Sequence, residues 1–204
     1  MIEYIHAQLL VTTLCNRQCR DCCYRIPGHE TLPPQHYDWP YFERAAEYLG
    51  NLNYLYVTGG EPTLHPQFVR IAAEFRVLFN PQRMVLATNG AGILQHIDSL
   101  DDFDEVRITN FGPPPTPETI LQVTERYPNK IVVRPGTHYS LEKRGGGYPC
   151  ERRYIPAYAN GRLYPCCVAP GIPDAVSIEP TNDWKLQLAE VPLPCASCLW
   201  STAP

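Results

Sequence analysis

Residues 14–25 read LCNRQCRDCCYR and gather four of the nine cysteines of this 204-residue chain. Cys15, Cys19 and Cys22 follow a C-x3-C-x2-C spacing, and Cys23 comes directly after them. Adjacent side chains of an extended segment point to opposite sides, so Cys22 and Cys23 rarely serve one ion. Zinc sites usually pair their thiolates as C-x2-C knuckles, whereas three thiolates on one loop suit three corners of a [4Fe–4S] cube. The spacing favours such a cluster, with its fourth iron open, over the zinc alternative.

The stretch follows the first of several strand-like segments, which alternate with helix-like ones as far as residue 134. Strands are predicted at residues 4–13, 55–58, 84–88, 105–109 and 131–134, and helices at 39–49, 66–79, 92–100 and 118–127. Asp38 and Pro40 are typical of the start of the first helix. This alternation implies parallel strands joined by right-handed crossovers. A full barrel takes about 250 residues, so the sequence predicts an α/β fold with a partial (β/α) barrel of about five to six parallel strands.

A second motif, VTGGEPTLHP at residues 57–66, overlaps the end of the second predicted strand. In parallel sheets the chemistry gathers at the carboxyl ends of the strands, where this motif and the cysteine cluster both fall. Gly59 and Gly60 allow a ligand to approach the backbone closely, and Glu61 offers a carboxylate that suits an ammonium group. The alternative interpretation is a tight turn before a helix, with His65 at the start of that helix.

Together the two motifs resemble those of the radical S-adenosylmethionine (SAM) superfamily. The resemblance implies that Cys15, Cys19 and Cys22 hold a [4Fe–4S] cluster whose open iron chelates the amino and carboxylate groups of SAM. It also implies that the GGE motif binds the SAM amino group and that polar residues after the third strand lie near the cofactor. The corresponding positions here are Gly59, Gly60, Glu61, Thr88 and Asn89.

One position departs from the superfamily pattern. The residue before the third cysteine is commonly aromatic and lies near the adenine, but here it is Asp21. Tyr24 is the candidate to replace it as the adenine contact, and Cys23 is interpreted as a bystander.

The remaining cysteines lie beyond residue 145 and resemble a second cluster site. Cys150, Gly161 and Cys166 follow a C-x10-G-x4-C spacing, and a C-x2-C pair completes the set. This pattern is similar to the auxiliary-cluster module called twitch, a shortened SPASM domain, and implies a second [4Fe–4S] cluster. A zinc ribbon is the alternative. The implied ligands are Cys150, Cys166, Cys195 and Cys198, with Cys167 as a structural residue.

The same region has its own secondary-structure pattern. Asn160-Gly161 is a strong two-residue turn signal and predicts a β-hairpin. A short helix is predicted at residues 184–190, with Asn182 or Asp183 as its cap. The sequence therefore predicts a radical SAM core at 1–144 and a twitch module, made of a hairpin plus a helix, at 145–204.

The resemblance further implies a reaction. One electron from a flavodoxin- or ferredoxin-type donor enters the first cluster and cleaves SAM, and the resulting 5′-deoxyadenosyl radical removes a hydrogen atom from the substrate. The protein positions the cofactor and excludes water. The second cluster would accept an electron in an oxidation, or would anchor the substrate. The layout resembles that of the twitch-bearing 2-deoxy-scyllo-inosamine dehydrogenases, so a dehydrogenase-like oxidoreductase is expected.

The substrate is less sharply indicated. The chain starts directly at the first predicted strand, so no upstream domain for a peptide leader is expected. This favours a sugar, aminocyclitol or nucleotide, with crosslinking, epimerisation or sulfur insertion in a peptide as the alternative. His138 and Tyr139 are acid–base candidates, with structural roles as the alternative. Basic side chains near the module junction either bind a phosphate or carboxylate of the substrate or lie in solvent. They are Arg134, Lys143, Arg144, Arg152 and Arg153.

Composition speaks against several classes of protein. The net charge of −4 disfavours a nucleic-acid partner, because nucleic-acid-binding domains are usually basic. No apolar run reaches the roughly 18–20 residues of a membrane span, and the N-terminus lacks signal-peptide features, so a cytoplasmic protein is expected. There, cysteines favour metal binding over disulfides. An iron–sulfur electron carrier or a zinc-binding interaction module is the alternative class, although a carrier needs neither an open iron nor Glu61.

Overall fold

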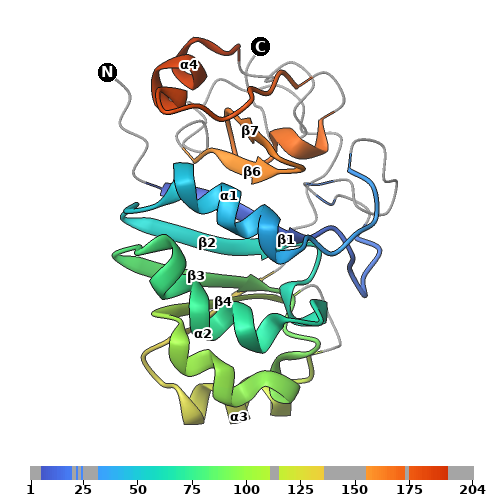
Figure 1. The fold of residues 1–204 in the computed structure, drawn as a ribbon. Helices are drawn as coiled ribbons and strands as arrows, with labels where there is room; N and C mark the ends of the chain where they lie inside the picture. Colours follow the sequence, from blue (N-terminus) through green and yellow to red (C-terminus); the bar gives the residue numbers. More distant parts are fainter. Residues whose placement is uncertain are drawn as a thin grey trace.

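The computed structural model describes residues 6–19, 22, 24, 32–110, 115–135, 155–172 and 175–192. These residues form a seven-stranded sheet with the order β5-β4-β3-β2-β1-β6-β7 (Figure 1). The strands are β1 (His6–Thr12), β2 (Tyr54–Gly59), β3 (Arg83–Thr88), β4 (Glu105–Asn110), β5 (Ile131–Pro135), β6 (Ala157–Ala159) and β7 (Arg162–Tyr164). The helices are α1 (Trp39–Leu49), α2 (Phe68–Phe79), α3 (Pro117–Arg126) and α4 (Trp184–Glu190), with 3-10 segments η1 (Pro62–Leu64), η2 (Ile93–Asp102) and η4 (Ala169–Gly171).

Six neighbouring strands run parallel, as the sequence predicted. β1 to β5 pair in chain order, and β6 adds to the free side of β1 in the same direction. Only β7 is antiparallel to its neighbour. Within the described residues β5 and β7 are the two edges of the sheet, so the barrel is open rather than closed.

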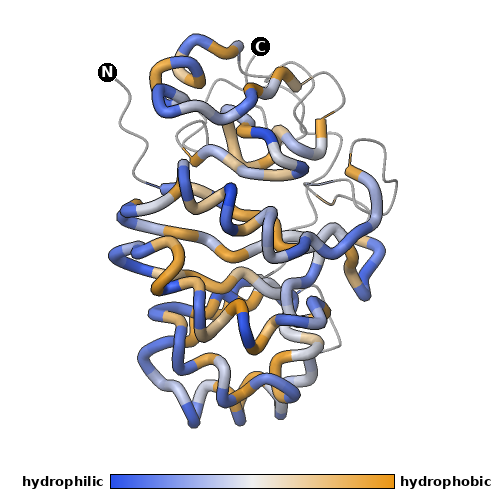
Figure 2. The backbone as a smooth tube through the Cα atoms, viewed as in Figure 1, coloured by the Kyte–Doolittle hydropathy of each residue, from blue (hydrophilic) through white to orange (hydrophobic). Residues whose placement is uncertain are grey.

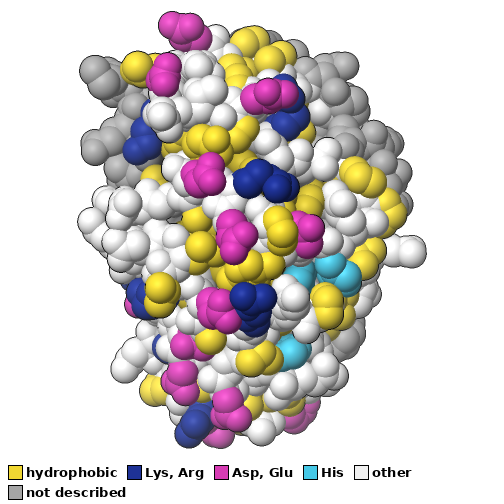
Figure 3. Space-filling view, viewed as in Figure 1, with side chains coloured by type: hydrophobic (Ala, Val, Ile, Leu, Met, Phe, Trp, Pro, Cys, Tyr) yellow, Lys and Arg dark blue, Asp and Glu magenta, His cyan; other side chains and the backbone are white. Residues whose placement is uncertain are grey.

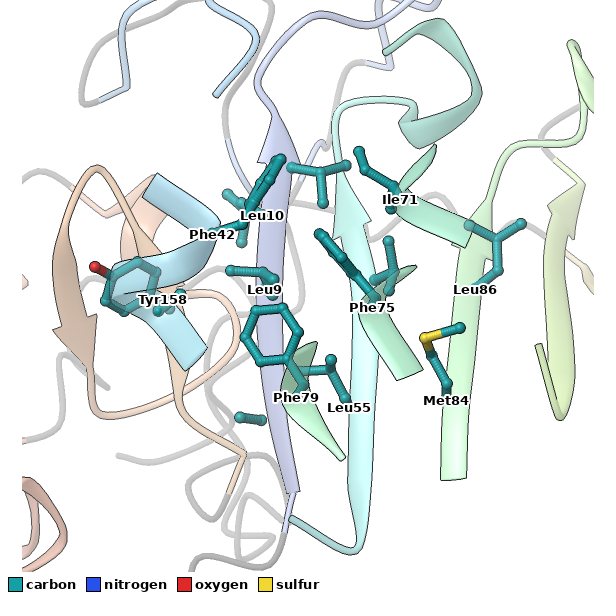
Figure 4. Close-up of a cluster of buried hydrophobic side chains, with 14 of the residues drawn as sticks. Leu9, Leu10, Phe42, Leu55, Ile71, Phe75, Phe79, Met84, Leu86 and Tyr158 are labelled. Atoms are coloured by element: carbon teal, nitrogen blue, oxygen red, sulfur yellow. The ribbon is translucent and has the colours of Figure 1, made fainter. Parts of the chain in front are cut away.

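The core lies between the sheet and the helices that cross in front of it in Figure 1. Figure 2 shows hydrophobic residues along the central strands and hydrophilic residues at many of the turns. Full burial of one such side chain stabilises the fold by about 1.5–3 kcal/mol. The close-up in Figure 4 labels members of this core that have no exposed surface: Leu9, Leu10, Phe42, Leu55, Ile71, Phe75, Phe79, Met84 and Leu86.

Local rules account for the start of α1. The Asp38 side chain accepts a hydrogen bond from Tyr41 N at 3.1 Å, and Pro40 occupies the first turn. An aspartate cap satisfies one of the free N–H groups of a helix start, and proline has no N–H to lose there. The predicted bounds of this helix, 39–49, are confirmed.

Two predicted helical features differ in the structure. The segment predicted as a helix at 92–100 is the 3-10 segment η2, and His96 adopts non-helical backbone angles inside it. Asp183 occupies the cap position of α4, but its side chain makes no capping hydrogen bond. Both corrections concern short segments, where tertiary packing outweighs local preference.

The predicted hairpin is confirmed as β6 and β7. Asn160 and Gly161 form its turn with φ values of 51° and 74°, the positive values that a type I′ turn requires. The hairpin does not stand apart from the core sheet: Gln8 and Leu9 of β1 pair with Ala157 and Tyr158 of β6. The predicted boundary at 144/145 falls outside the described residues, and the division into two modules stays a prediction.

Acidic and basic side chains alternate over the helix side of the molecule (Figure 3). Arg70 packs on Trp39, with its guanidinium carbon 3.6 Å from a ring centroid, and pairs with Glu74 at 2.9 Å. Exposed pairs of this kind contribute about 0–1 kcal/mol each. Among the described helices, none combines the length and the apolar character that crossing a membrane requires.

Candidate active site

Three motifs meet at the edge formed by the carboxyl ends of β1, β2 and β3. The cysteine loop follows β1, Gly60 follows the last residue of β2 (Gly59), and Asn89 follows the last residue of β3 (Thr88). Because the strands are parallel, segments far apart in the sequence become neighbours here. Hydrogen bonds then join all three motifs.

Two buried threonines at the end of β1 hold both ends of the cysteine loop. Thr13 Oγ1 donates to Pro33 O at 2.6 Å and accepts from Gln35 N at 2.8 Å. Thr12 Oγ1 donates to Gln35 O at 3.0 Å and accepts from Leu14 N at 3.0 Å. The segments before and after the cysteine loop are therefore held together at the end of β1. These threonines were not among the predicted site residues, although two adjacent hydroxyl side chains directly before the cysteine loop are a usable signal.

Gly59 and Gly60 let the backbone of the cysteine loop approach β2. A Cβ on Gly59 would lie 2.1 Å from Thr12 O, and one on Gly60 would lie 2.1 Å from Leu14 O. The same approach allows Gly60 N to donate to Thr12 O and Glu61 N to donate to Leu14 O, both at 2.8 Å. In the structure the missing Cβ atoms make room for the chain itself, and the predicted close approach of a ligand to these glycines stays a prediction. A tight turn is also present, since η1 follows directly.

Glu61 is fully buried and joins the ends of β2 and β3. Its Oε1 accepts hydrogen bonds from Thr63 N at 3.1 Å, Thr63 Oγ1 at 2.7 Å and Thr88 Oγ1 at 2.6 Å. Its Oε2 accepts from Asn89 N at 2.6 Å. Burial raises the pKa of Glu61, and these donors offset part of that rise because they stabilise the carboxylate. The carboxylate has no exposed surface, and its predicted contact with an ammonium group stays a prediction.

Asn89 continues this network to the first cysteine. Its Nδ2 donates to Asn16 Oδ1 at 2.9 Å and to Cys15 Sγ at 3.7 Å. Its Oδ1 accepts from Ala91 N at 2.9 Å. A chain of hydrogen bonds therefore runs from the buried Glu61 carboxylate to the Cys15 thiol.

Cys15, Cys19 and Cys22 are free and half-buried, and Cys22 N donates to Cys19 O at 3.2 Å. Burial raises the pKa of Cys15 to about 11, with smaller upward effects from Glu61, Cys22 and Cys19 and an opposing hydrogen bond from the Arg17 backbone. All three thiols belong to the one loop that follows β1. A thiol with such a pKa is protonated at neutral pH until a bound cation displaces the proton. The donor set therefore fits a thiolate-bound cluster.

Among the described residues, no three His, Cys, Asp or Glu side chains are grouped so as to hold a single metal ion. In a cubane each thiolate binds a different iron, so its ligands are spread more widely than those of a single ion.

Only some of the other predicted site residues lie in the part of the chain that the structure describes. Tyr24 is buried and its hydroxyl donates to Gln8 of β1, and its adenine contact stays a prediction. Cys166 and Cys167 are buried after β7, in an apolar cluster with Val168 and others. Arg134 is exposed near the end of β5. The remaining candidates lie outside the described residues: Asp21, Cys23, His138, Tyr139, Lys143, Arg144, Cys150, Arg152, Arg153, Cys195 and Cys198.

His65, beside the GGE motif, has a structural role. Its Nδ1 accepts from Gln67 N at 3.1 Å, so its Nε2 carries the proton and donates to Tyr37 O at 2.9 Å. Burial lowers the pKa of His65, which keeps the ring neutral. This residue supports the start of α2, in agreement with the prediction of a residue at the helix start.

One polar group was missed by the sequence analysis. Arg107 of β4 donates to Glu105 and, at 3.3 Å, to the Tyr56 hydroxyl of β2. Strand alternation places these three side chains on the face of the sheet opposite to Leu55 and Val106, which are part of the buried core. The alternation of charged and apolar residues in EVRITN, residues 105–110, could have revealed a polar face inside the partial barrel.

Comparison with known proteins identifies the family. Residues 9–134 match the sequence profile described as the Radical SAM superfamily. The match covers more than half of the chain and includes all three motifs of the candidate site. The chain therefore belongs to the Radical SAM superfamily, and the predicted family resemblance is confirmed.

Two curated relatives share part of the sequence. GTP 3′,8-cyclase of Actinobacillus pleuropneumoniae serotype 7 (strain AP76) is 31% identical over 99 residues, which is 47% of this chain and 29% of the relative. GTP 3′,8-cyclase of Haemophilus ducreyi (strain 35000HP / ATCC 700724) is 30% identical over 93 residues, 43% of this chain and 26% of the relative. The chain thus matches less than a third of the length of these relatives.

Two solved structures share the fold over most of the chain. The crystal structure of BtrN in complex with AdoMet and 2-DOIA aligns with a TM-score of 0.63 and 14% identity, covering 80% of this chain and 73% of that one. BtrN in an open conformation aligns with a TM-score of 0.54 and 16% identity, covering 79% and 69%. At such identities the likeness concerns the fold.

Proposed function

We propose that this radical SAM enzyme oxidises a small polar substrate of the sugar, aminocyclitol or nucleotide type after removing one hydrogen atom from it. The observation that carries the proposal is the junction of the three motifs at one edge of the sheet. There the cysteine loop contacts the GGE motif through Gly60 N and Glu61 N, and contacts the end of β3 through Asn89. Ligands of open α/β sheets bind at this edge.

In this proposal Cys15, Cys19 and Cys22 hold the first cluster, the SAM contacts come from the GGE motif, Thr88 and Tyr24, and Asn89 fixes the cysteine loop. When bound, the cluster would supply the electron for the reductive cleavage of SAM. The chain's own contribution is to fix the loop, through its threonines and glycines, so that cofactor and substrate meet in one geometry.

The oxidation needs an acceptor for a second electron. Hydrogen-atom removal leaves a substrate radical, which becomes the oxidised product by losing one electron and one proton. A second [4Fe–4S] cluster on Cys150, Cys166, Cys195 and Cys198 would take the electron, and His138 or Tyr139 would take the proton. Support comes from the C-x10-G-x4-C spacing and from the hairpin, which brings Cys166 to the end of β7.

A second candidate function follows from the curated relatives. They are named GTP 3′,8-cyclase, so rearrangement of a nucleoside triphosphate is a specific alternative to oxidation. It conserves the oxidation level of the substrate, and the product therefore distinguishes it from a dehydrogenation. Modification of a peptide remains the third possibility.

The test is a deuterium-transfer screen with the anaerobically reconstituted full chain, SAM and dithionite. Perdeuterated sugars, aminocyclitols and nucleotides, GTP among them, are supplied one at a time, and 5′-deoxyadenosine is analysed by mass spectrometry. We expect deuterium in 5′-deoxyadenosine with one small polar substrate, together with a product two mass units lighter than its unlabelled substrate when the reaction is repeated without label.

Two other results would contradict the proposed oxidation or the proposed substrate class. A product of unchanged mass from GTP would establish the cyclase-type reaction instead. Deuterium transfer from a perdeuterated peptide library, with none from any small molecule, would contradict the proposed substrate class.

A further inference from the structure

The Asn89 side chain presents an N–H group to the sulfur of Cys15. Its Nδ2 lies 3.7 Å from Cys15 Sγ and 2.9 Å from Asn16 Oδ1. Amide nitrogen and oxygen are often hard to tell apart, but here the assignment is fixed because Oδ1 accepts the N–H of Ala91 at 2.9 Å. The nitrogen side of the amide must therefore face the sulfur.

A hydrogen bond to the buried Glu61 carboxylate holds the backbone of Asn89, and with it the side-chain amide, in this position. Asn89 N donates to the buried Glu61 carboxylate at 2.6 Å, and that carboxylate is bound in turn by Thr63 and Thr88. Asn89 itself is only 7% exposed. The direction of the N–H group is thus set by the folded interior rather than by solvent.

All hydrogen-bonding atoms of this amide are used inside the protein. The two hydrogens of Nδ2 serve Asn16 and Cys15, and Oδ1 serves Ala91. An amide that is committed in this way is better suited to fixing the cysteine than to binding SAM. The role of Asn89 therefore differs from the cofactor contact that the family resemblance implies.

A donor beside a cluster thiolate has a defined electrostatic consequence. Hydrogen bonds to the sulfurs are among the factors that set iron–sulfur reduction potentials, and partners of the ligands also orient them. Reduction adds negative charge to the cluster, so a donor stabilises the reduced form more than the oxidised form. Its removal lowers the potential.

We propose that Asn89 is a positioning residue that orients the Cys15 thiolate and raises the reduction potential of the first cluster. The inference rests on the proposed function in one respect, the assignment of Cys15 as a ligand of that cluster. It assigns to this asparagine, 74 residues away in sequence, control over how readily the cluster takes up its electron.

Two variants and one control test the proposal. Asn89→Ser keeps an oxygen that can accept from Ala91 N but cannot reach the sulfur. Asn89→Asp keeps the size and the acceptor, and replaces the N–H group by a charged oxygen. Asn16→Ala is the matched control, because it removes the other acceptor of Nδ2 from an exposed position and leaves the N–H to Cys15 in place.

The readout is a redox titration of the reconstituted full chain, followed by electron paramagnetic resonance without SAM. The first-cluster signal is identified as the one that Cys15→Ala removes. At a fixed potential we expect the ratio of reduced to oxidised first cluster to fall about tenfold in Asn89→Ser, a shift of about 59 mV for one electron. It should fall further in Asn89→Asp and stay unchanged in Asn16→Ala.

Iron content and thermal unfolding complete the test. Loss of the first cluster in both Asn89 variants, with unchanged unfolding and full iron in Asn16→Ala, supports the positioning role. An unchanged potential in a loaded Asn89 variant overturns the proposal while the enzyme function stands. Absence of any cluster from the wild-type chain overturns both.

Discussion

The two described groups of cysteines have the same side chain and opposite surroundings. Cys15, Cys19 and Cys22 are half-buried on a loop, and polar groups of three strands converge on its base. Cys166 and Cys167 are only 6% and 2% exposed and lie in an apolar cluster with Val168, Ala169 and Ile172. The first region leaves its cysteines partly accessible at the carboxyl edge of the sheet, whereas the second keeps its cysteines away from solvent.

Cysteine replacement should separate the two regions most strongly. Replacing Cys15, Cys19 and Cys22 together with alanine should abolish SAM cleavage and leave about four of the eight irons expected for two cubanes. Cys166→Ala should leave SAM cleavage intact in the absence of substrate and remove the other four. Iron analysis and 5′-deoxyadenosine assays check both, and loss of all iron from the triple variant would contradict the division into two sites.

The glycines next to the two regions should respond differently to an added methyl group. Gly60→Ala would place a Cβ 2.1 Å from Leu14 O, and overpacking of this kind typically costs 1–3 kcal/mol or more. We expect it to displace the cysteine loop and to weaken assembly of the first cluster. Gly161→Ala meets nothing within 4 Å, but its φ of +74° implies a strain of about 1–3 kcal/mol.

Iron content distinguishes these two glycine variants even if their unfolding free energies, measured in urea, are similar. Gly161→Ala should retain the first cluster. Equal retention of that cluster by Gly60→Ala would refute the close contact between β2 and the loop.

Replacement of Glu61 should destabilise the first region more than a similar change in the second. In Glu61→Gln the amide nitrogen must face either Thr63 N or Asn89 N, whichever way it is turned. One buried N–H therefore loses its acceptor, at a cost of about 1–3 kcal/mol. The control Glu179→Gln affects only an exposed pair with Arg162, worth about 0–1 kcal/mol. Urea denaturation of both variants measures the difference. Equal losses of unfolding free energy would refute the role of Glu61 in joining the ends of β2 and β3 by buried hydrogen bonds.

Acid should weaken the first region through His65. Burial lowers the pKa of this ring in the folded state, so its contribution to stability is fully present above the ordinary value of 6.5. That contribution is lost as the pH falls from 6.5 toward the lowered value, because the unfolded chain then binds the proton more readily. His65→Gln should reduce the slope of unfolding free energy against pH in this range. An unaltered slope would show that the other histidines account for it.

The predictable parts of this fold are those that local rules determine. Asp38 and Pro40 defined the start of α1, and Asn160-Gly161 defined the hairpin turn. The break in η2 at His96 was not predictable, because the Nε2 of this residue lies 3.1 Å from Thr63 O in η1, which is 33 residues away in the sequence. The residues next to His96 in the sequence do not indicate this hydrogen-bond partner.

The candidate site divides in the same way. Its three motifs could be recognised in the sequence, because the spacing of the cysteines and the GGE sequence resemble the superfamily motifs; their roles as cluster ligands and SAM contacts stay predictions. The contacts that Gly59 and Gly60 make with Thr12 and Leu14 were not predictable, because they depend on β2 lying beside the end of β1. The contact between Asn89 and Cys15 was also invisible, since only the parallel register of the sheet brings these residues together.

The proposal that this chain binds two [4Fe–4S] clusters and cleaves SAM is tested most directly by metal analysis and a SAM-cleavage assay of the wild-type chain. After anaerobic reconstitution with iron and sulfide, the account predicts about eight irons per chain, broad absorbance near 400 nm, and release of 5′-deoxyadenosine from SAM with dithionite. Stoichiometric zinc without that absorbance, and with SAM left intact, would contradict it.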